Sequence, residues 1–146
     1  IIRAGDSAMN GIFEVFGGAT LGKTVIGNYI SGSNSTAEHV FGGIINLPST
    51  EDLADGGAIQ RNLASSHFST GGSGETSTLA AGTEGLIKVL AMKDDGGGDM
   101  VVTVTNAGWK SSGTGTITFA NRGESCTLMY ISAKWFAIGN NGATFA

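Results

Sequence analysis

The sequence predicts an all-β protein, namely an antiparallel β-sandwich of jelly-roll-like form with at most one short helical turn. Glycine makes up 25 of the 146 residues, against a usual share of about 7%, and only 14% of the residues are charged. Segments rich in Ala, Leu, Glu and Lys, which favour helices, are missing. Short runs of Thr, Ser, Val, Ile and aromatic residues alternate instead with glycine-rich turns, which is typical of sandwiches and barrels.

A series of short strands is expected, separated by turn sequences such as GGAT, SGSNST, STGGSG and DDGGGD. The predicted strands are residues 9–16, 24–30, 40–47, 58–63, 67–69, 76–79, 86–92, 100–105, 114–119, 125–131 and 134–138. The helical turn is expected at PSTEDLA, because Ser49 or Thr50 can cap a first turn that carries Glu51 and Asp52. These elements predict one sandwich domain over residues 1–146, in which residues 1–20 complete the sandwich or serve as an arm or edge strand in assembly.

Alternation of apolar and polar residues indicates which strand faces are buried. Met100, Val102 and Val104 share one face of their strand, and Ile117 and Phe119 share one face of the next. Three other strands, LIKVLAM, CTLMYI and KWFAI, are apolar on both faces. Because a small sandwich keeps one face of each sheet polar, a second subunit is expected to cover these strands. The sequence therefore predicts a homo-oligomer.

The expected oligomer or lattice interface draws on these strands and on nearby aromatic residues. Two tryptophans and Tyr130 are alternatively the ring platform of a sugar site, although such residues more often anchor cores and interfaces. The predicted interface residues are Trp109, Tyr130, Trp135, Phe136, Leu86, Ile87 and Val89.

The stretch GGATLGKT, from Gly17 to Thr24, matches the phosphate-binding loop pattern G-x-x-x-x-G-K-[ST]. A phosphate-binding loop requires a helix directly after it, whose amino-terminal amides hold the phosphates. The sequence that follows, VIGNYISGSNST, carries β-branched residues and glycine and stops within a few residues. A turn between two strands is the favoured interpretation, and a nucleotide-binding enzyme is the remote alternative.

Neither catalysis, nor a cofactor, nor a metal is predicted by the remaining motifs. His39 and His67, the two histidines, lack partners in a catalytic pattern. Three aspartates lie between Asp94 and Asp99 in KDDGGGD, but without the alternating ligands of a calcium loop, so an acidic hairpin turn is expected. Cys126 is the single cysteine and lies in an apolar strand, where a buried structural thiol is expected.

The net charge and the hydropathy of the chain indicate which classes of partner to expect. The formal net charge is −4 at pH 7, so the chain offers no basic field for a nucleic acid. A run of 18 or more apolar residues, as a membrane-spanning helix requires, is also missing. Neither a nucleic acid nor a membrane is therefore expected as a partner.

The carboxy-terminal half carries four phrases in order: LAAGTEGLIKVLAM, VVTVTNAGW, GTITF and TLMYISAKWFAIGNNG. In these phrases it resembles a module of small structural proteins from tailed-bacteriophage virions, particularly phages of cyanobacteria and other aquatic bacteria. The resemblance implies a β-rich, non-enzymatic protein that is commonly a trimer, and three roles for it: capsid decoration (cement) protein, head fibre or tail-fibre domain.

Two functions follow from the sequence and the resemblance together. The first is a capsid decoration protein on the virion surface, bound as a homotrimer to the lattice of the major capsid protein. The alternative is a fibre module that binds a host receptor or glycan, with the loops SGSNST, STGGSG and KDDGGGD as the contact surface.

Overall fold

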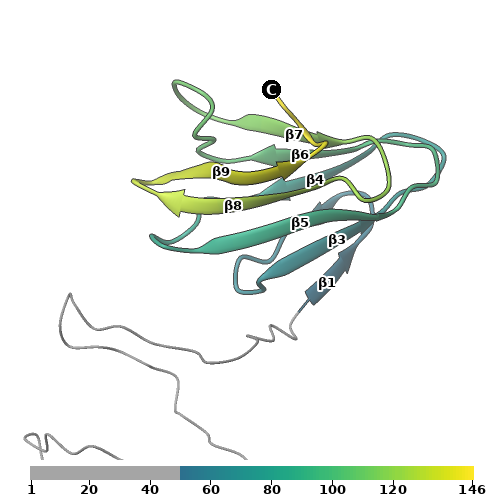
Figure 1. Ribbon diagram of the computed structural model, residues 1–146, viewed down its shortest axis with the longest axis horizontal. Coiled ribbons are helices and arrows are strands. Elements are labelled where there is room, and N and C mark those ends of the chain that lie inside the picture. Colours follow the sequence, from purple (N-terminus) through teal and green to yellow (C-terminus); the bar gives the residue numbers. More distant parts are fainter. Residues whose placement is uncertain (1–49) are drawn as a thin grey trace, which may run out of the picture. The chain divides into compact units, whose positions relative to one another are not determined.

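The computed structural model describes residues 50–146, and this part of the chain is all-β, with no helix (Figure 1). The expected all-β class is confirmed. The strands are β1 (Thr50–Leu53), β2 (Gly57–Ala58), β3 (Ser65–Ser69), β4 (Glu75–Leu79), β5 (Ile87–Asp94), β6 (Met100–Val104), β7 (Gly115–Phe119), β8 (Ser125–Ile131), β9 (Lys134–Asn141) and β10 (Thr144–Phe145).

These strands form two five-stranded sheets. The first sheet has the order β1-β3-β5-β8-β9, and the second has the order β10-β7-β6-β4-β2. In Figure 1 the first sheet lies in front, with β6 and β7 of the second behind it. Because the first six strands alternate between the two sheets, the chain winds back and forth from one sheet to the other.

This winding makes both sheets mixed rather than antiparallel. The pairs β1–β3, β3–β5, β2–β4 and β4–β6 are parallel, and the remaining pairs are antiparallel. The prediction of a purely antiparallel arrangement is wrong. The period-two pattern that predicted the strands reports which face of a strand is buried, and it carries no information on the direction of its neighbour.

One hydrophobic core is shared by the two sheets. The rings of Phe68 on β3 and Phe119 on β7 lie 5.3 Å apart, centroid to centroid, and so join the first sheet to the second. The predicted inward positions of the second sheet are confirmed, since Met100, Val102, Val104, Ile117 and Phe119 are fully buried. Burial of each such side chain contributes roughly 1.5–3 kcal/mol to folding, which makes this core the main source of stability.

Strand boundaries in the second half agree with the predicted ranges to within a few residues, and two earlier segments differ. Residues 50–53 form β1 rather than a helical turn, because Glu51 is drawn inward, where it accepts hydrogen bonds from Ser66 and Lys88. The strand predicted over residues 58–63 shortens to Gly57–Ala58. Beyond it the carbonyl oxygens of Gln60 and Leu63 accept hydrogen bonds from Lys88 and not from a neighbouring strand.

Several predictions lie outside the described residues. They are the strands at residues 9–16, 24–30 and 40–47, the phosphate-binding loop pattern at residues 17–24, the loop SGSNST at residues 31–36, His39, and the arm or edge strand at residues 1–20. Both described sheets and their shared core are formed within residues 50–146. Whether residues 1–49 belong to the same domain is therefore not tested, and the prediction of one domain over residues 1–146 stays a prediction.

Candidate assembly surface

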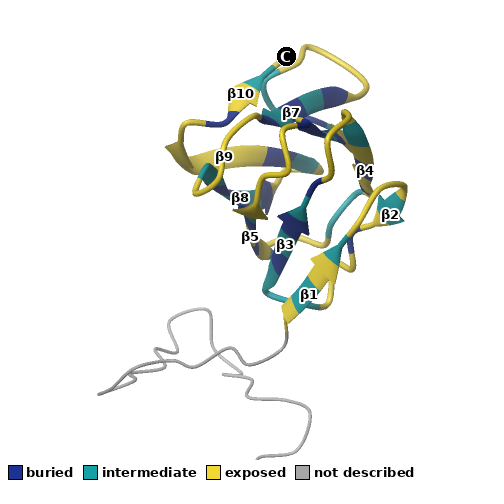
Figure 2. Cartoon of the chain, turned by 90° about the vertical axis from the view of Figure 1, so that its right-hand side faces the viewer, coloured by how far each residue is buried: buried dark blue, intermediate teal, exposed yellow. Residues whose placement is uncertain are grey.

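Exposed apolar side chains gather on three adjacent strands of the first sheet. Within residues 50–146 the large hydrophobic side chains that are exposed all belong to β5, β8 and β9. Figure 2 shows β9 exposed over most of its length. We call this set the outer apolar face: Ile87 (51% exposed), Val89 (37%), Ile131 (37%), Phe136 (37%) and Ile138 (54%).

The strand register aligns part of this face into a continuous apolar row. Ile87 on β5 pairs with Met129 on β8, which pairs in turn with Phe136 on β9. The next row of the same face runs from Val89 through Thr127 to the glycine of β9. Neither row contains a charged residue. A partner that covers these rows therefore buries apolar side chains without burying an uncompensated charge.

Toward the opposite edge of the sheet, at β1 and β3, the same face carries charged residues. His67 on β3 lies opposite Asp52 on β1, with Nδ1 3.4 Å from Oδ1. Lys93 on β5 donates a hydrogen bond of 2.9 Å to Oδ2 of the same carboxylate. This hydrogen bond, helped by the nearby positive charge, lowers the pKa of Asp52. Parallel pairing of β1 with β3 thus brings Asp52 beside His67, a contact that the separation of the two residues in the sequence did not reveal.

Among residues 50–146, strand β9 is also an unpaired edge of its sheet over much of its length. Its beginning is covered, since the amide of Trp135 donates to the carbonyl of Asn106 and its carbonyl accepts from Gly108. Lys134 secures this cover by donating to the carbonyl oxygens of residues 110 and 111. The following residues, FAIGNN, carry no charge. Edge strands that stay solitary are usually protected by charge, proline or a bulge at the exposed edge, and β9 has only a bulge opposite Thr127 and Leu128.

The predicted interface residues separate into three groups. Ile87, Val89 and Phe136 belong to the outer apolar face. Tyr130 and Trp135 lie in the core instead, in a T-shaped pair with ring centroids 5.0 Å apart. The indole Nε1 of Trp135 donates a 3.0 Å hydrogen bond to the carbonyl of Ala80, so its polar atom is satisfied in that position.

Trp109 and Leu86 are partly buried and pack against the core. The indole of Trp109 donates to the carbonyl of Ala146 at 3.1 Å and meets the ring of Phe145 edge to face. Because Tyr130 and Trp135 are buried, the three rings do not form an exposed platform for a sugar. Aromatic composition alone does not distinguish a core ring from a platform ring.

Three apolar surface residues were missing from the predicted set: Met129, Ile131 and Ile138. Their signal was present in the sequence, since CTLMYI and KWFAI are apolar on both faces. The alternation was ambiguous because either face of such a strand can be the inner one. The structure makes the Leu128 side of β8 the inner face. Leu128 belongs to the core that the two sheets share, and Met129 does not.

The acidic loop packs against a second glycine-rich loop. The amide of Thr70 donates to the carbonyl of Asp94, and the amide of Glu75 donates to the carbonyl of Asp99. A Cβ on Gly98 would overlap the carbonyl oxygen of Ser73, so glycine is needed where the loops cross. In the part of the chain that the structure describes, His, Cys, Asp and Glu side chains form no group of three that suits a metal ion.

Cys126 lies in the core on β8, and burial raises the pKa of its thiol to about 12. The thiol is therefore protonated at neutral pH and is a poor nucleophile or metal ligand. Residues 50–146 also contain no helix with the length and apolar character needed to cross a membrane.

Comparisons with known proteins returned no match: neither the family models, nor the curated proteins, nor the solved structures include one similar to this chain.

Proposed function

We propose that this protein is a non-enzymatic structural component that assembles with copies of itself through the outer apolar face of β5, β8 and β9. The observation that carries the proposal is the uncharged row of Ile87, Met129 and Phe136, flanked by the exposed Ile138. A second copy is the occupant that this surface favours. Both partners then bring neutral faces together, although each chain has a net charge of −4.

The proposed architecture is a β-sandwich with jelly-roll-like packing, and the proposed oligomer is a homotrimer. The shared core and the Phe68–Phe119 contact support the sandwich. The trimer rests on the resemblance of the carboxy-terminal half to phage virion proteins. In this assembly Ile87, Val89 and Phe136 contact the neighbouring subunit, whereas Tyr130 and Trp135 support the strands from beneath.

The proposed location is the surface of a phage capsid, where the trimer acts as a decoration protein on the lattice of the major capsid protein. Many repeated contacts, each weak alone, are sufficient to hold such a protein on a symmetric shell. Because it binds only the intact lattice, it stabilises the shell by mass action. The low content of charged residues and the shared apolar core suit this structural role.

The test is to mix the purified full chain with bare phage heads and to sediment the mixture. Co-sedimentation, together with release of the genome at a higher temperature than from bare heads, supports decoration. Protein that stays in the supernatant, or equal release temperatures, argues against it. The variant Phe136→Lys tests whether self-assembly and decoration are linked. If the trimer is the form that binds the heads, loss of the trimer should weaken this binding.

A tail-fibre module is the second candidate, favoured by the contact between two of the loops predicted to bind a receptor. The amide of Gly96 donates to Oγ1 of Thr70, so STGGSG and KDDGGGD form one surface at an end of the sheets. Binding of the protein to host cells, lost when these loops are changed to alanine and serine, would favour this candidate. Nucleotide binding by residues 17–24 stays a remote alternative, and the absence of ATP or GTP binding would exclude it.

A further inference from the structure

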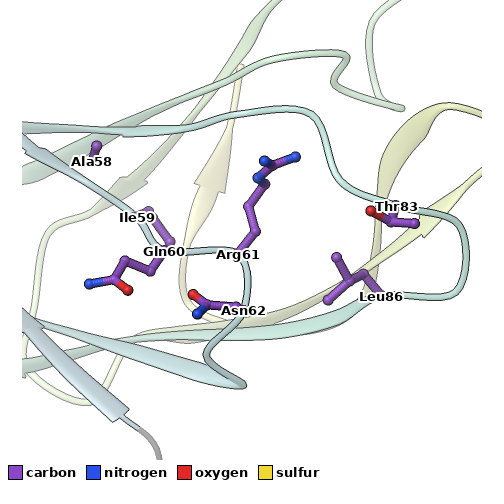
Figure 3. Close-up of a pocket in the computed structure, with 7 residues that line it drawn as sticks. All are labelled: Ala58, Ile59, Gln60, Arg61, Asn62, Thr83 and Leu86. Atoms are coloured by element: carbon purple, nitrogen blue, oxygen red, sulfur yellow. The ribbon is translucent and has the colours of Figure 1, made fainter. Parts of the chain in front are cut away.

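A cavity of about 510 Å³ opens between the chain after β2 and the connection from β4 to β5. This volume lies within the range of small-molecule sites. Ile59 and Leu86 supply apolar surface, and Figure 3 shows the Arg61 side chain extending between Ile59 on one side and Thr83 with Leu86 on the other. The lining residues are Ala58, Ile59, Gln60, Arg61, Asn62, Thr83 and Leu86.

The wall that carries Arg61 is held in place by a buried ion pair. Lys88 is fully buried, and its ammonium group donates hydrogen bonds of 2.8 Å to the carbonyl oxygens of Gln60 and Leu63. Glu51 accepts a 2.9 Å hydrogen bond from the amide of Gln60 and lies 3.5 Å from the same ammonium group. The two ends of the segment around Arg61 are thereby fixed, which reduces the ordering cost when a ligand binds.

The opposite wall is fixed as well. The carbonyl of Ala80 accepts from the indole of Trp135, and the amide of Gly85 donates to the carbonyl of Tyr130. A Cβ on Gly82 would come within 2.8 Å of the rings of both aromatic residues, so glycine permits the close approach. The cavity therefore lies between two walls that the core positions.

The polar groups of the cavity favour an anion. Arg61 donates one hydrogen bond, of 2.5 Å, from Nη1 to the carbonyl of Ala81, and forms no ion pair with any described residue. A guanidinium group has five N–H donors, so four remain. The lining contains no carboxylate. Glu84, beside it in the sequence, accepts hydrogen bonds from the amide of Ser132 instead.

We infer that this cavity binds a small acidic saccharide, with its carboxylate on Arg61 and its hydroxyl groups on the neighbouring side chains. A guanidinium group can bind a carboxylate in a bidentate manner, through two parallel hydrogen bonds. The side-chain amides of Gln60 and Asn62 and the hydroxyl of Thr83 can each donate and accept hydrogen bonds, as sugar hydroxyls require. Ile59 and Leu86 suit the C–H faces of a sugar ring. This ligand site is separate from the outer apolar face and does not depend on its function.

The experiment is calorimetric titration of the full chain with glucuronate, galacturonate, glucose and inorganic phosphate. At least one of the two uronates should bind about tenfold more tightly than glucose, because a hydrogen bond to a charged group is worth at least one factor of ten in affinity. Asn62→Asp, which changes one amide to a carboxylate beside Arg61, should weaken uronate binding by about tenfold or more. Arg61→Gln should do the same, and Arg122→Gln, at an exposed arginine outside the cavity, should leave binding unchanged.

Uronates that bind no better than glucose overturn the inference, as does unchanged affinity in Asn62→Asp. Equal binding of phosphate and uronate overturns the saccharide assignment, since the site then selects any small anion. Arg61→Gln also removes the hydrogen bond to Ala81. If it fails to fold, Asn62→Asp decides the outcome, because the side chain of Asn62 has no hydrogen-bond partner among the described residues.

Discussion

The ammonium group of Lys88 lies 3.5 Å from the Oε1 atom of Glu51, and the side chain of Lys88 is completely shielded from water. Glu51 comes from β1, at the edge of the first sheet, and Lys88 comes from β5 at its centre. Burial lowers the pKa of Lys88, and the charge of Glu51 opposes this shift. The pair joins the edge strand to the core and orients the loop that carries Arg61.

Replacement of Glu51 by Gln should destabilise the protein by about 3 kcal/mol at pH 7, because it leaves a buried ammonium group without its counter-charge. Urea unfolding measures this change. The matched control is Asp99→Asn, at an exposed carboxylate, which should change the free energy of unfolding by less than about 0.5 kcal/mol. Equal stability of Glu51→Gln and the parent would mean that the ion pair does not hold β1.

The cost of Glu51→Gln should also depend on pH. The variant loses the charge that raises the pKa of Lys88, so this pKa falls further below the usual value of 10.5. As the pH rises through the window between the folded and unfolded pKa values, the unfolded chain binds more protons than the folded one, and the variant gains stability relative to the parent. The difference in unfolding free energy should therefore be smaller at pH 10 than at pH 7. A constant difference would contradict the assignment to Lys88.

Gly98→Ala should destabilise the protein by about 1–3 kcal/mol, because the new methyl group overlaps the carbonyl oxygen of Ser73 and forces two loops apart. Gly72→Ala, in the opposite loop, is the control. Its Cβ meets nothing closer than 3.9 Å, so stability should be nearly unchanged. Thermal unfolding of both variants measures the effect, and similar melting temperatures would show that the loops adapt without cost.

Ala133→Gly should stabilise the hairpin between β8 and β9. Ser132 and Ala133 form its two-residue turn with φ values of 49° and 63°, a conformation that favours glycine. Relief of about 1–2 kcal/mol of strain exceeds the entropic cost of about 0.4–1 kcal/mol in the unfolded chain, so a net gain is expected. Ala120→Gly, where φ is not positive, should be destabilising instead. A loss of stability in both variants would contradict the strain argument.

The thiol of Cys126 should be nearly unreactive in the folded protein. Burial raises its pKa to about 12, so very little thiolate exists at pH 8. Mass spectrometry should find little labelling by iodoacetamide in buffer and complete labelling in concentrated urea. Fast labelling of the folded protein would mean that β8 opens readily.

The sequence predicted the inner faces of β6 and β7 well, but it predicted neither β1 nor the inner faces of β5, β8 and β9, for identifiable reasons. In MVVTV one face is apolar and the other carries threonine, so the inner face was clear. At Thr50–Leu53 a local capping pattern indicated a helical turn, but the distant Lys88 draws Glu51 into a strand. The parallel pairing was not predictable, since alternation does not encode direction. Lys88 itself was predictable in principle, because it shares its strand face with the buried Leu90 and Met92.

The candidate surface was anticipated from the strands that are apolar on both faces, which led to Ile87, Val89 and Phe136. Tyr130 and Trp135 were assigned with them because large aromatic residues occur both in cores and at interfaces. Their burial depends on the twist and packing of two sheets, which no local pattern specifies. Arg61 gave no signal in the sequence, since its importance comes from two loops that the fold brings together.

Light scattering of the full chain at micromolar concentration tests the central claim most directly, alongside the variants Phe136→Lys and Thr103→Lys. The first places a charge in the outer apolar face, and the second places one at an exposed position of the other sheet. The proposal predicts three times the chain mass for the parent and for Thr103→Lys, and the mass of a single chain for Phe136→Lys. A monomeric parent, or a Phe136→Lys variant that stays trimeric, would contradict assembly through this face.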